Sequence, residues 1–150
     1  MNDTRELLRL VDQSVWANLQ WVEFVFNQQN PEQRPRELLT HIMTGEVIWF
    51  DRVAGRKDAA ADSTMGRDEL VRGFHENAAT FRKLISGDVE RVIHFRRASG
   101  EEYHARVVDI LHHLFTHGYH HRGQLAAHYA RSGGKYPNTD HINFLLVNKL

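Results

Sequence analysis

Histidines gather in one short stretch of the chain, THGYHHRGQL, which spans residues 116–125. His117 and His121 are four residues apart, so on a helix their rings stand one above the other. Two imidazoles placed in this way can offer nitrogen atoms to a single metal ion. The alternative is a solvated helix face with one hydrogen-bonded core histidine, and this stretch alone does not decide between the two.

The rotation of the helix expected at residues 106–131 separates these histidines from their neighbours. Its apolar residues share one arc: Val107, Ile110, Leu111, Leu114, Phe115 and Leu125. At about 100° per residue, His117 and His121 lie on the shoulder of that arc, whereas His113 and His120 lie further toward solvent. The rotation therefore favours the pair at 117 and 121 as the inward one.

A second helix, expected at residues 36–54, contributes further polar residues to an apolar surface. His41 lies on the edge of its apolar arc, and three imidazoles with an open position make a catalytic type of metal site. Glu46 falls near the middle of the same arc, where a carboxylate needs a partner. Arg122, on the apolar side of its own helix, is a candidate partner for Glu46. The alternative for His41 alone is a hydrogen-bonded core residue.

Two tryptophans and an asparagine are candidates to line an apolar mouth at such a site. Trp16, Asn18 and Trp49 all take inward positions on the first two expected helices. The alternative for the tryptophans is plain core packing. For Asn18 it is a buried polar residue that sets the helix register.

Apolar residues at three- and four-residue spacing predict the elements that position these side chains. The expected helices run from the capping pattern Asp3-x-x-Glu6 to about residue 28, over 36–54, 66–86 and 106–131, and over a short final stretch at 140–149. Ser63 or Thr64 is expected to cap the third helix. Alternation in residues 89–104 around Ser99-Gly100 predicts a short hairpin or extended crossover. We expect residues 1–150 to form a single all-α domain: a four-helix bundle with a long crossover between the third and fourth helices.

The composition excludes several classes of protein. Lysine plus arginine and aspartate plus glutamate both number 19, so no overall field favours nucleic acid or an anionic membrane. There is no cysteine, which excludes disulfides, thiolate zinc sites and a cysteine nucleophile. The N-terminus carries charges where a signal peptide needs an apolar core, and no apolar run approaches the roughly 20 residues of a membrane span. We expect a cytoplasmic protein.

Two segments resemble those of a known family. HIMTGEVIWFDRV, residues 41–53, and THGYHHRGQL resemble the second and fourth helices of the DinB-like (YfiT-like) metal-binding bundles, whose fourth-helix motif is His-Gly-x-His-His-Arg-Gly-Gln. Trp16-Ala-Asn18 and the closing NFLLV match more loosely. The resemblance implies a bundle that binds one divalent metal ion.

Motif position assigns the ligands that the resemblance implies as His41, His117 and His121. His120, Arg122 and Glu46 would then support the ligands or the fold. Two motif glycines, Gly118 and Gly123, would allow close contact between helices.

The resemblance also implies a function. Characterised members of the family resemble thiol-dependent transferases and isomerases that use bacillithiol, mycothiol or glutathione. We therefore expect a metal-dependent thiol transferase that acts on a small electrophile. A metal-dependent hydrolase and a non-enzymatic metal-binding stress-response bundle are the alternatives. Zinc, nickel, iron and copper all suit three imidazoles.

The first helix predicts a second copy of the chain as partner. Its aromatic residues spread around much of the helix: Trp16, Trp21, Phe24 and Phe26. One core does not absorb all of these rings, and large exposed apolar patches mark interfaces. We expect a homodimer formed through helices of the bundle, and the resemblance implies the same.

Overall fold

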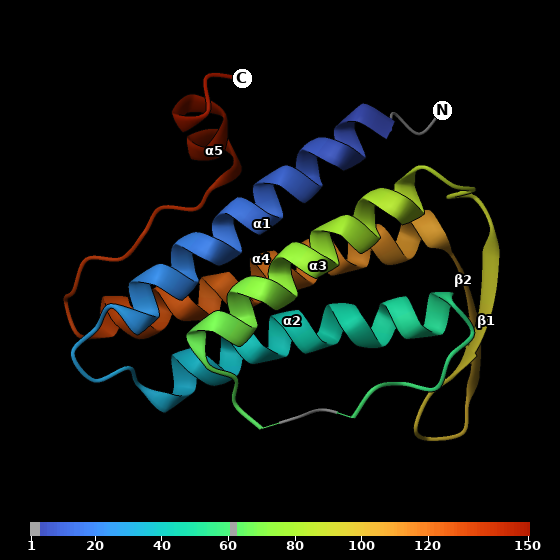
Figure 1. The fold of residues 1–150 in the computed structure, drawn as a ribbon, viewed down its shortest axis with the longest axis horizontal. Coiled ribbons are helices and arrows are strands. Elements are labelled where there is room, and N and C mark those ends of the chain that lie inside the picture. The colour runs from blue at the N-terminus through green and yellow to red at the C-terminus, as the bar shows by residue number, and fades with distance from the viewer. Residues whose placement is uncertain (1–3, 61–62) are drawn as a thin grey trace.

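The computed structural model describes residues 4–60 and 63–150, and it is predominantly helical (Figure 1). In chain order, the elements are α1 (Thr4–Phe26), α2 (Gln33–Val53), α3 (Arg67–Ile85), β1 (Val92–Arg96), β2 (Glu102–Arg106), α4 (Val107–Arg131) and α5 (His141–Val147). Figure 1 shows the four long helices packed along one another and the hairpin at one end. α5 lies outside these four helices and packs on α1. The predicted all-α bundle with a hairpin crossover is confirmed.

The packing of the helices pairs α1 with α3 and α2 with α4. The second pairing matters for function, because His41 lies on α2 whereas His117 and His121 lie on α4. Within the described residues, no helix is both long and apolar enough to cross a bilayer.

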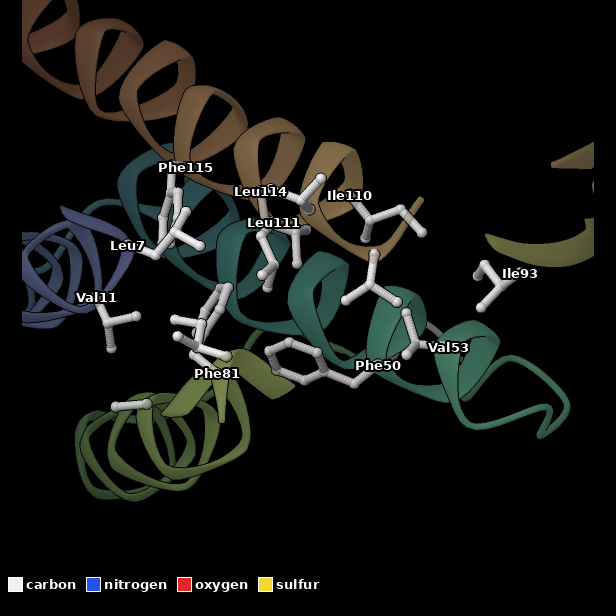
Figure 2. Packing of buried hydrophobic residues seen from close by; sticks show 14 residues of the cluster. Leu7, Val11, Phe50, Val53, Phe81, Ile93, Ile110, Leu111, Leu114 and Phe115 are labelled. Carbon is white, nitrogen blue, oxygen red and sulfur yellow. The ribbon is translucent and has the colours of Figure 1, made fainter. Parts of the chain in front are cut away.

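An apolar cluster fills the bundle toward its hairpin end, and all four long helices contribute to it (Figure 2). Phe50 of α2, Phe81 of α3 and Phe115 of α4 are buried in it, and the ring of Phe81 packs against both of the others, at 4.9 Å and 5.2 Å between centroids. A second buried cluster contains Trp21 of α1 together with Leu39 of α2 and other apolar residues. These clusters hold α2 and α4 in fixed rotation about their axes.

The crossover between α3 and α4 is an antiparallel hairpin in which Ile93 pairs with Ala105. Gly100 has a positive φ of 87° and its N–H donates to the carbonyl of Arg97 at 2.8 Å, which closes the turn. The expected turn at Ser99-Gly100 is thus found.

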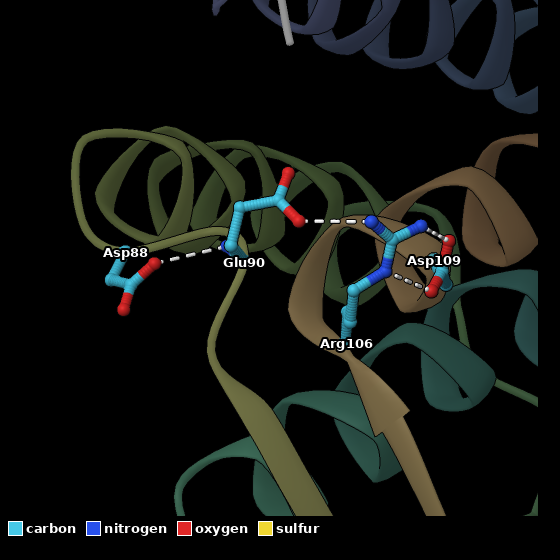
Figure 3. Close-up of polar contacts among 4 residues, drawn as sticks. All are labelled: Asp88, Glu90, Arg106 and Asp109. Atoms are coloured by element: carbon cyan, nitrogen blue, oxygen red, sulfur yellow. Dashed lines mark hydrogen bonds and ion pairs between the residues drawn. The ribbon is translucent and has the colours of Figure 1, made fainter. Parts of the chain in front are cut away.

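Arg106 fixes the point at which the hairpin enters α4 (Figure 3). It donates to Asp109 from Nε at 2.8 Å and to Glu90 from Nη1 at 2.9 Å. The backbone N–H of Glu90 in turn donates to Asp88 at 3.0 Å. These contacts join the end of β2, the start of α4 and the turn after α3.

Helix starts differ from the predictions in two places. α2 begins at Gln33, with Pro35 inside its first turn; proline is tolerated there because first-turn N–H groups have no acceptor within the helix. α3 is capped by Gly66 and not by Ser63 or Thr64. The N–H of Met65 donates to Thr40 Oγ1 at 3.0 Å, so the chain is attached to α2 before α3 starts. The predicted cap at residue 3 lies outside the described residues.

Candidate metal centre

Three histidine rings from two helices meet at one point. His117 Nε2 lies 3.2 Å from His41 Nε2 and 3.1 Å from His121 Nε2. Two nitrogen ligands of a tetrahedral zinc ion lie about 3.3–3.4 Å apart, given bond lengths of about 2.0–2.1 Å. The spacing is therefore close to that required by a single ion. Of the described residues, only these form a group of three or more histidine, aspartate or glutamate side chains able to hold a metal.

The protonation chemistry of the cluster also suits a cation. A ring nitrogen carries either one proton or one lone pair, so His117 Nε2 cannot hydrogen-bond well to both neighbours at once. Burial, followed by the charges of His121 and His41, lowers the pKa of His117 to about 4. Burial also lowers the pKa of His121. Both rings are thus neutral near pH 7, which is the form that binds metal.

Gln124 orients one of the rings. His121 Nδ1 lies 2.7 Å from Gln124 Oε1. An amide oxygen only accepts, so Nδ1 carries the proton and Nε2 keeps its lone pair for an ion. This role of Gln124 was not predicted from the sequence, although Gln124 ends the fourth-helix motif and lies three residues after His121, where helical side chains meet.

Gly45 leaves room for the ring of His117 in the cluster. A Cβ atom at this position would lie 3.1 Å from His117 Cε1, closer than ordinary packing permits. Glycine inside a helix costs roughly 1 kcal/mol relative to alanine, and here its absent side chain lets the ring of α4 approach α2. A glycine inside a helix, four residues after His41, is the feature of the sequence that points to this close approach.

The cluster borders a cavity of about 430 Å³. His41 and His121 form part of its wall, and the other lining residues are Arg34, Glu37, Leu38, Thr40, Thr44 and Thr64. A cavity of this volume can hold a small molecule. The described part of its wall combines one apolar side chain with hydroxyl groups and charges of both signs.

The structure does not bring Trp16, Asn18 or Trp49 to this cavity. Trp16 packs against Phe144 of α5, with 5.5 Å between ring centroids. Trp49 packs against Phe95 of the hairpin at 5.0 Å. Asn18 is buried inside the bundle. The tryptophans serve as packing residues, which was the alternative reading of both.

Glu46 is buried, as expected, but its hydrogen bond goes neither to Arg122 nor to a cluster histidine. Asn77 of α3 donates from Nδ2 to Glu46 Oε2 at 2.7 Å and to the carbonyl of Met43 at 3.1 Å. Burial raises the pKa of Glu46 to about 7, while the Asn77 hydrogen bond and the charge of Arg122 act in the opposite direction. Glu46 thus lies in the polar interior between α2 and α3, without a hydrogen bond to a cluster histidine.

Arg122 is buried on the side of α4 that faces α1. Its Nη1 donates to Asn18 Oδ1 at 2.8 Å, so Asn18 and Arg122 form the pair. Gly118 makes room for this side chain, because a Cβ atom there would lie 2.8 Å from Arg122 Nη1. Gly123 has open space around it and mediates no close helix contact. His120 is exposed, with its ring centroid 4.9 Å from that of His121.

The fold and the site together define a class of protein: a helical bundle with a three-histidine candidate metal centre between its second and fourth helices. The DinB family matches residues 13–147, and the chain belongs to that family. A search of curated proteins finds no match to the chain.

Proposed function

We propose that His41, His117 and His121 bind one divalent metal ion, and that the protein is a thiol-dependent transferase acting on a small electrophile. The observation that carries the proposal is the convergence of three ring nitrogens, 3.1 Å and 3.2 Å apart, beside a cavity of about 430 Å³. Zinc, nickel and iron all suit this donor set. The choice of thiol chemistry is supported by the resemblance of the two histidine-containing segments to thiol-dependent DinB-like proteins.

The residues of the site have separate tasks in this proposal. The neutral rings of His117 and His121 offer lone pairs, and Gln124 holds the second ring in position. A divalent ion bound there would lower the pKa of a thiol and so supply a thiolate near neutral pH. The chain has no cysteine, so the sulfur comes from a cosubstrate such as bacillithiol, mycothiol or glutathione.

A metal-dependent hydrolase is the second candidate, because among the described residues one carboxylate borders the same cavity. Glu37 lines the cavity together with His41, whereas Glu46 does not. A hydrolase needs a general base within hydrogen-bond reach of the attacking water. Glu37 also accepts a hydrogen bond from Gln33 at 2.7 Å. We therefore rank thiol transfer, which needs no such base, above hydrolysis.

The deciding assay uses metal-loaded protein, chlorodinitrobenzene as electrophile, and bacillithiol, mycothiol or glutathione as thiol. In the transfer, a sulfur–carbon bond forms, chloride leaves and the thiol proton goes to the buffer. We expect thioether formation that requires both the thiol and the metal and is lost in His121→Ala. Thiol-independent ester cleavage lost in the same variant would overturn the transferase in favour of the hydrolase. Metal binding with neither reaction would favour the non-enzymatic alternative.

We also propose a homodimer in the cytoplasm, but the dimer now rests on a different helix. Two rings of α1 pack within the chain: Trp21 stacks on Tyr129 at 6.0 Å, and Trp16 packs on Phe144. The exposed large apolar residues lie mainly at the C-terminus: Ile142, Leu146, Val147 and Leu150, which are 58–70% exposed. Light scattering at micromolar concentration should give a dimeric mass for the wild type and a monomeric mass for Leu146→Glu. A monomeric wild type would contradict the dimer.

A further inference from the structure

A second cavity, of about 400 Å³, lies against a different face of α4 from the histidine cluster. Tyr119, Arg122 and Ala126 line it from α4, at three- and four-residue spacing. At about 100° per residue, their face lies about 150° around the helix from that of His117 and His121. Its other wall is the segment between α4 and α5. The two cavities are therefore separate sites.

Arg122 is the unusual group in the wall of this second cavity. Its side chain is buried, with 3% of the residue exposed, and only Nη1 has a hydrogen-bond partner. Nε and Nη2 are buried, and neither has a hydrogen-bond partner among the residues that the structure describes. Within the described part of the chain, Glu46 is the carboxylate whose charge acts on this guanidinium, and it does so without a hydrogen bond. A buried charge with unpaired donors is costly, and Nε and Nη2 form the edge that binds a carboxylate through two hydrogen bonds.

The remaining wall defines what else the ligand must carry. The ring of Tyr119 lies over the guanidinium of Arg122 at 4.8 Å. Tyr136 stacks on Trp21 at 6.1 Å, with 14° between the planes. Both tyrosines line the cavity, so it offers aromatic surface next to the cation. Asp140 also lines it and adds a negative charge, which disfavours ligands with several negative charges.

We propose that this cavity binds a small aromatic monocarboxylate. The carboxylate accepts hydrogen bonds from Nε and Nη2 of Arg122, and the ring of the ligand packs on Tyr119 and Tyr136. Nε and Nη2 are buried in this structure, so binding requires the wall around Arg122 to shift until the carboxylate reaches them. The volume is within the range of small-molecule sites. Occupancy of this site does not require the metal.

The test is a titration of metal-free protein with benzoate, followed by NMR of the Trp21 indole N–H. This group donates to Thr139 Oγ1 at 3.1 Å, and both residues line the cavity. We expect a saturable shift with benzoate and at least tenfold weaker binding of benzamide, which lacks the charge, and of acetate, which lacks the ring. Removing metal prevents benzoate from binding at the histidine cluster.

Three variants complete the test. Arg122→Gln should weaken benzoate at least tenfold, and Ala126→Phe should block the cavity while leaving Arg122 in place. Arg131→Gln removes an exposed arginine of the same helix and should bind benzoate as the wild type does. The absence of a saturable shift, equal affinity for benzamide, or unchanged binding in Ala126→Phe would overturn the proposal. If Arg122→Gln does not fold, the benzamide comparison and Ala126→Phe decide the question.

Discussion

Glu46→Gln replaces a buried carboxylate by a neutral amide of nearly the same shape, and we expect it to stabilise the folded protein at neutral pH. Burial raises the pKa of Glu46 from its ordinary value of 4.5 to about 7. Between these values the folded chain keeps a proton that the unfolded chain has released, so the free energy of unfolding falls as the pH rises. The loss of folding stability begins near pH 4.5 and is complete above about pH 7.

The size of the effect follows from the shift. Each pKa unit corresponds to about 1.4 kcal/mol, so a shift from 4.5 to about 7 is worth about 3 kcal/mol. Glutamine does not ionise, and its amide oxygen can still accept the hydrogen bond from Asn77. The variant should therefore match the wild type near pH 4 and exceed it by about 3 kcal/mol near pH 8. That gain moves the urea midpoint by about 1.5 M if the slope is about 2 kcal/mol per molar.

The assay is urea unfolding of metal-free protein, followed by far-UV circular dichroism at several pH values. Taking the difference between variant and wild type at each pH cancels the titration of the histidines. Glu37→Gln, which removes a carboxylate that lines the open cavity on the same helix, controls for the loss of one negative charge. A difference for Glu46→Gln that stays constant between pH 4 and pH 8, or a loss of stability near pH 8, would refute the reasoning.

Two further substitutions probe the support of the histidine rings. Gln124→Leu removes the oxygen that accepts the hydrogen bond from His121 Nδ1. We expect the metal affinity to fall about 10- to 100-fold with the fold unchanged, as measured by isothermal titration calorimetry. Unaltered metal affinity would contradict the role of Gln124. Gly45→Ala places a Cβ atom 3.1 Å from His117 Cε1, so we expect weaker metal binding together with helix stability raised by up to about 1 kcal/mol. Gly123→Ala is the control, because a Cβ atom at this position meets open space. This variant should gain the same helix stability and bind metal as the wild type does. Equal metal affinity in both alanine variants would count against the role of Gly45.

Much of the fold could be predicted because apolar periodicity depends on local sequence. The long helices lie within a few residues of their predicted limits, and the turn of the hairpin is at Gly100 as expected. Periodicity does not determine where a helix starts. Pro35 was interpreted as part of a turn, whereas the first turn of a helix accepts it.

The histidine cluster was partly predictable for the same reason. Helical rotation selects His117 and His121 from their neighbours, and the motif adds His41. The distances between these rings depend on how α2 packs against α4. The apolar periodicity of a single helix contains no information on that packing. Gly45 leaves room for the ring of His117 at that contact.

Contacts between distant segments could not be predicted. The partner of Glu46 is Asn77, 31 residues away, because the rotation of α3 against α2 places its amide there. Trp21 stacks on Tyr136, which lies in the segment between α4 and α5. Because that segment has no helical period, the sequence did not predict that it would cover an aromatic ring of α1.

Metal analysis of purified protein tests the central claim most directly. After saturation with zinc, nickel or iron and exhaustive dialysis, elemental analysis should find about one ion per chain in the wild type. His117→Ala should retain none, whereas His113→Ala, an exposed histidine one turn away on the same helix, should retain the full content. Wild type that binds no ion under these conditions, or full metal content in His117→Ala, would contradict the account.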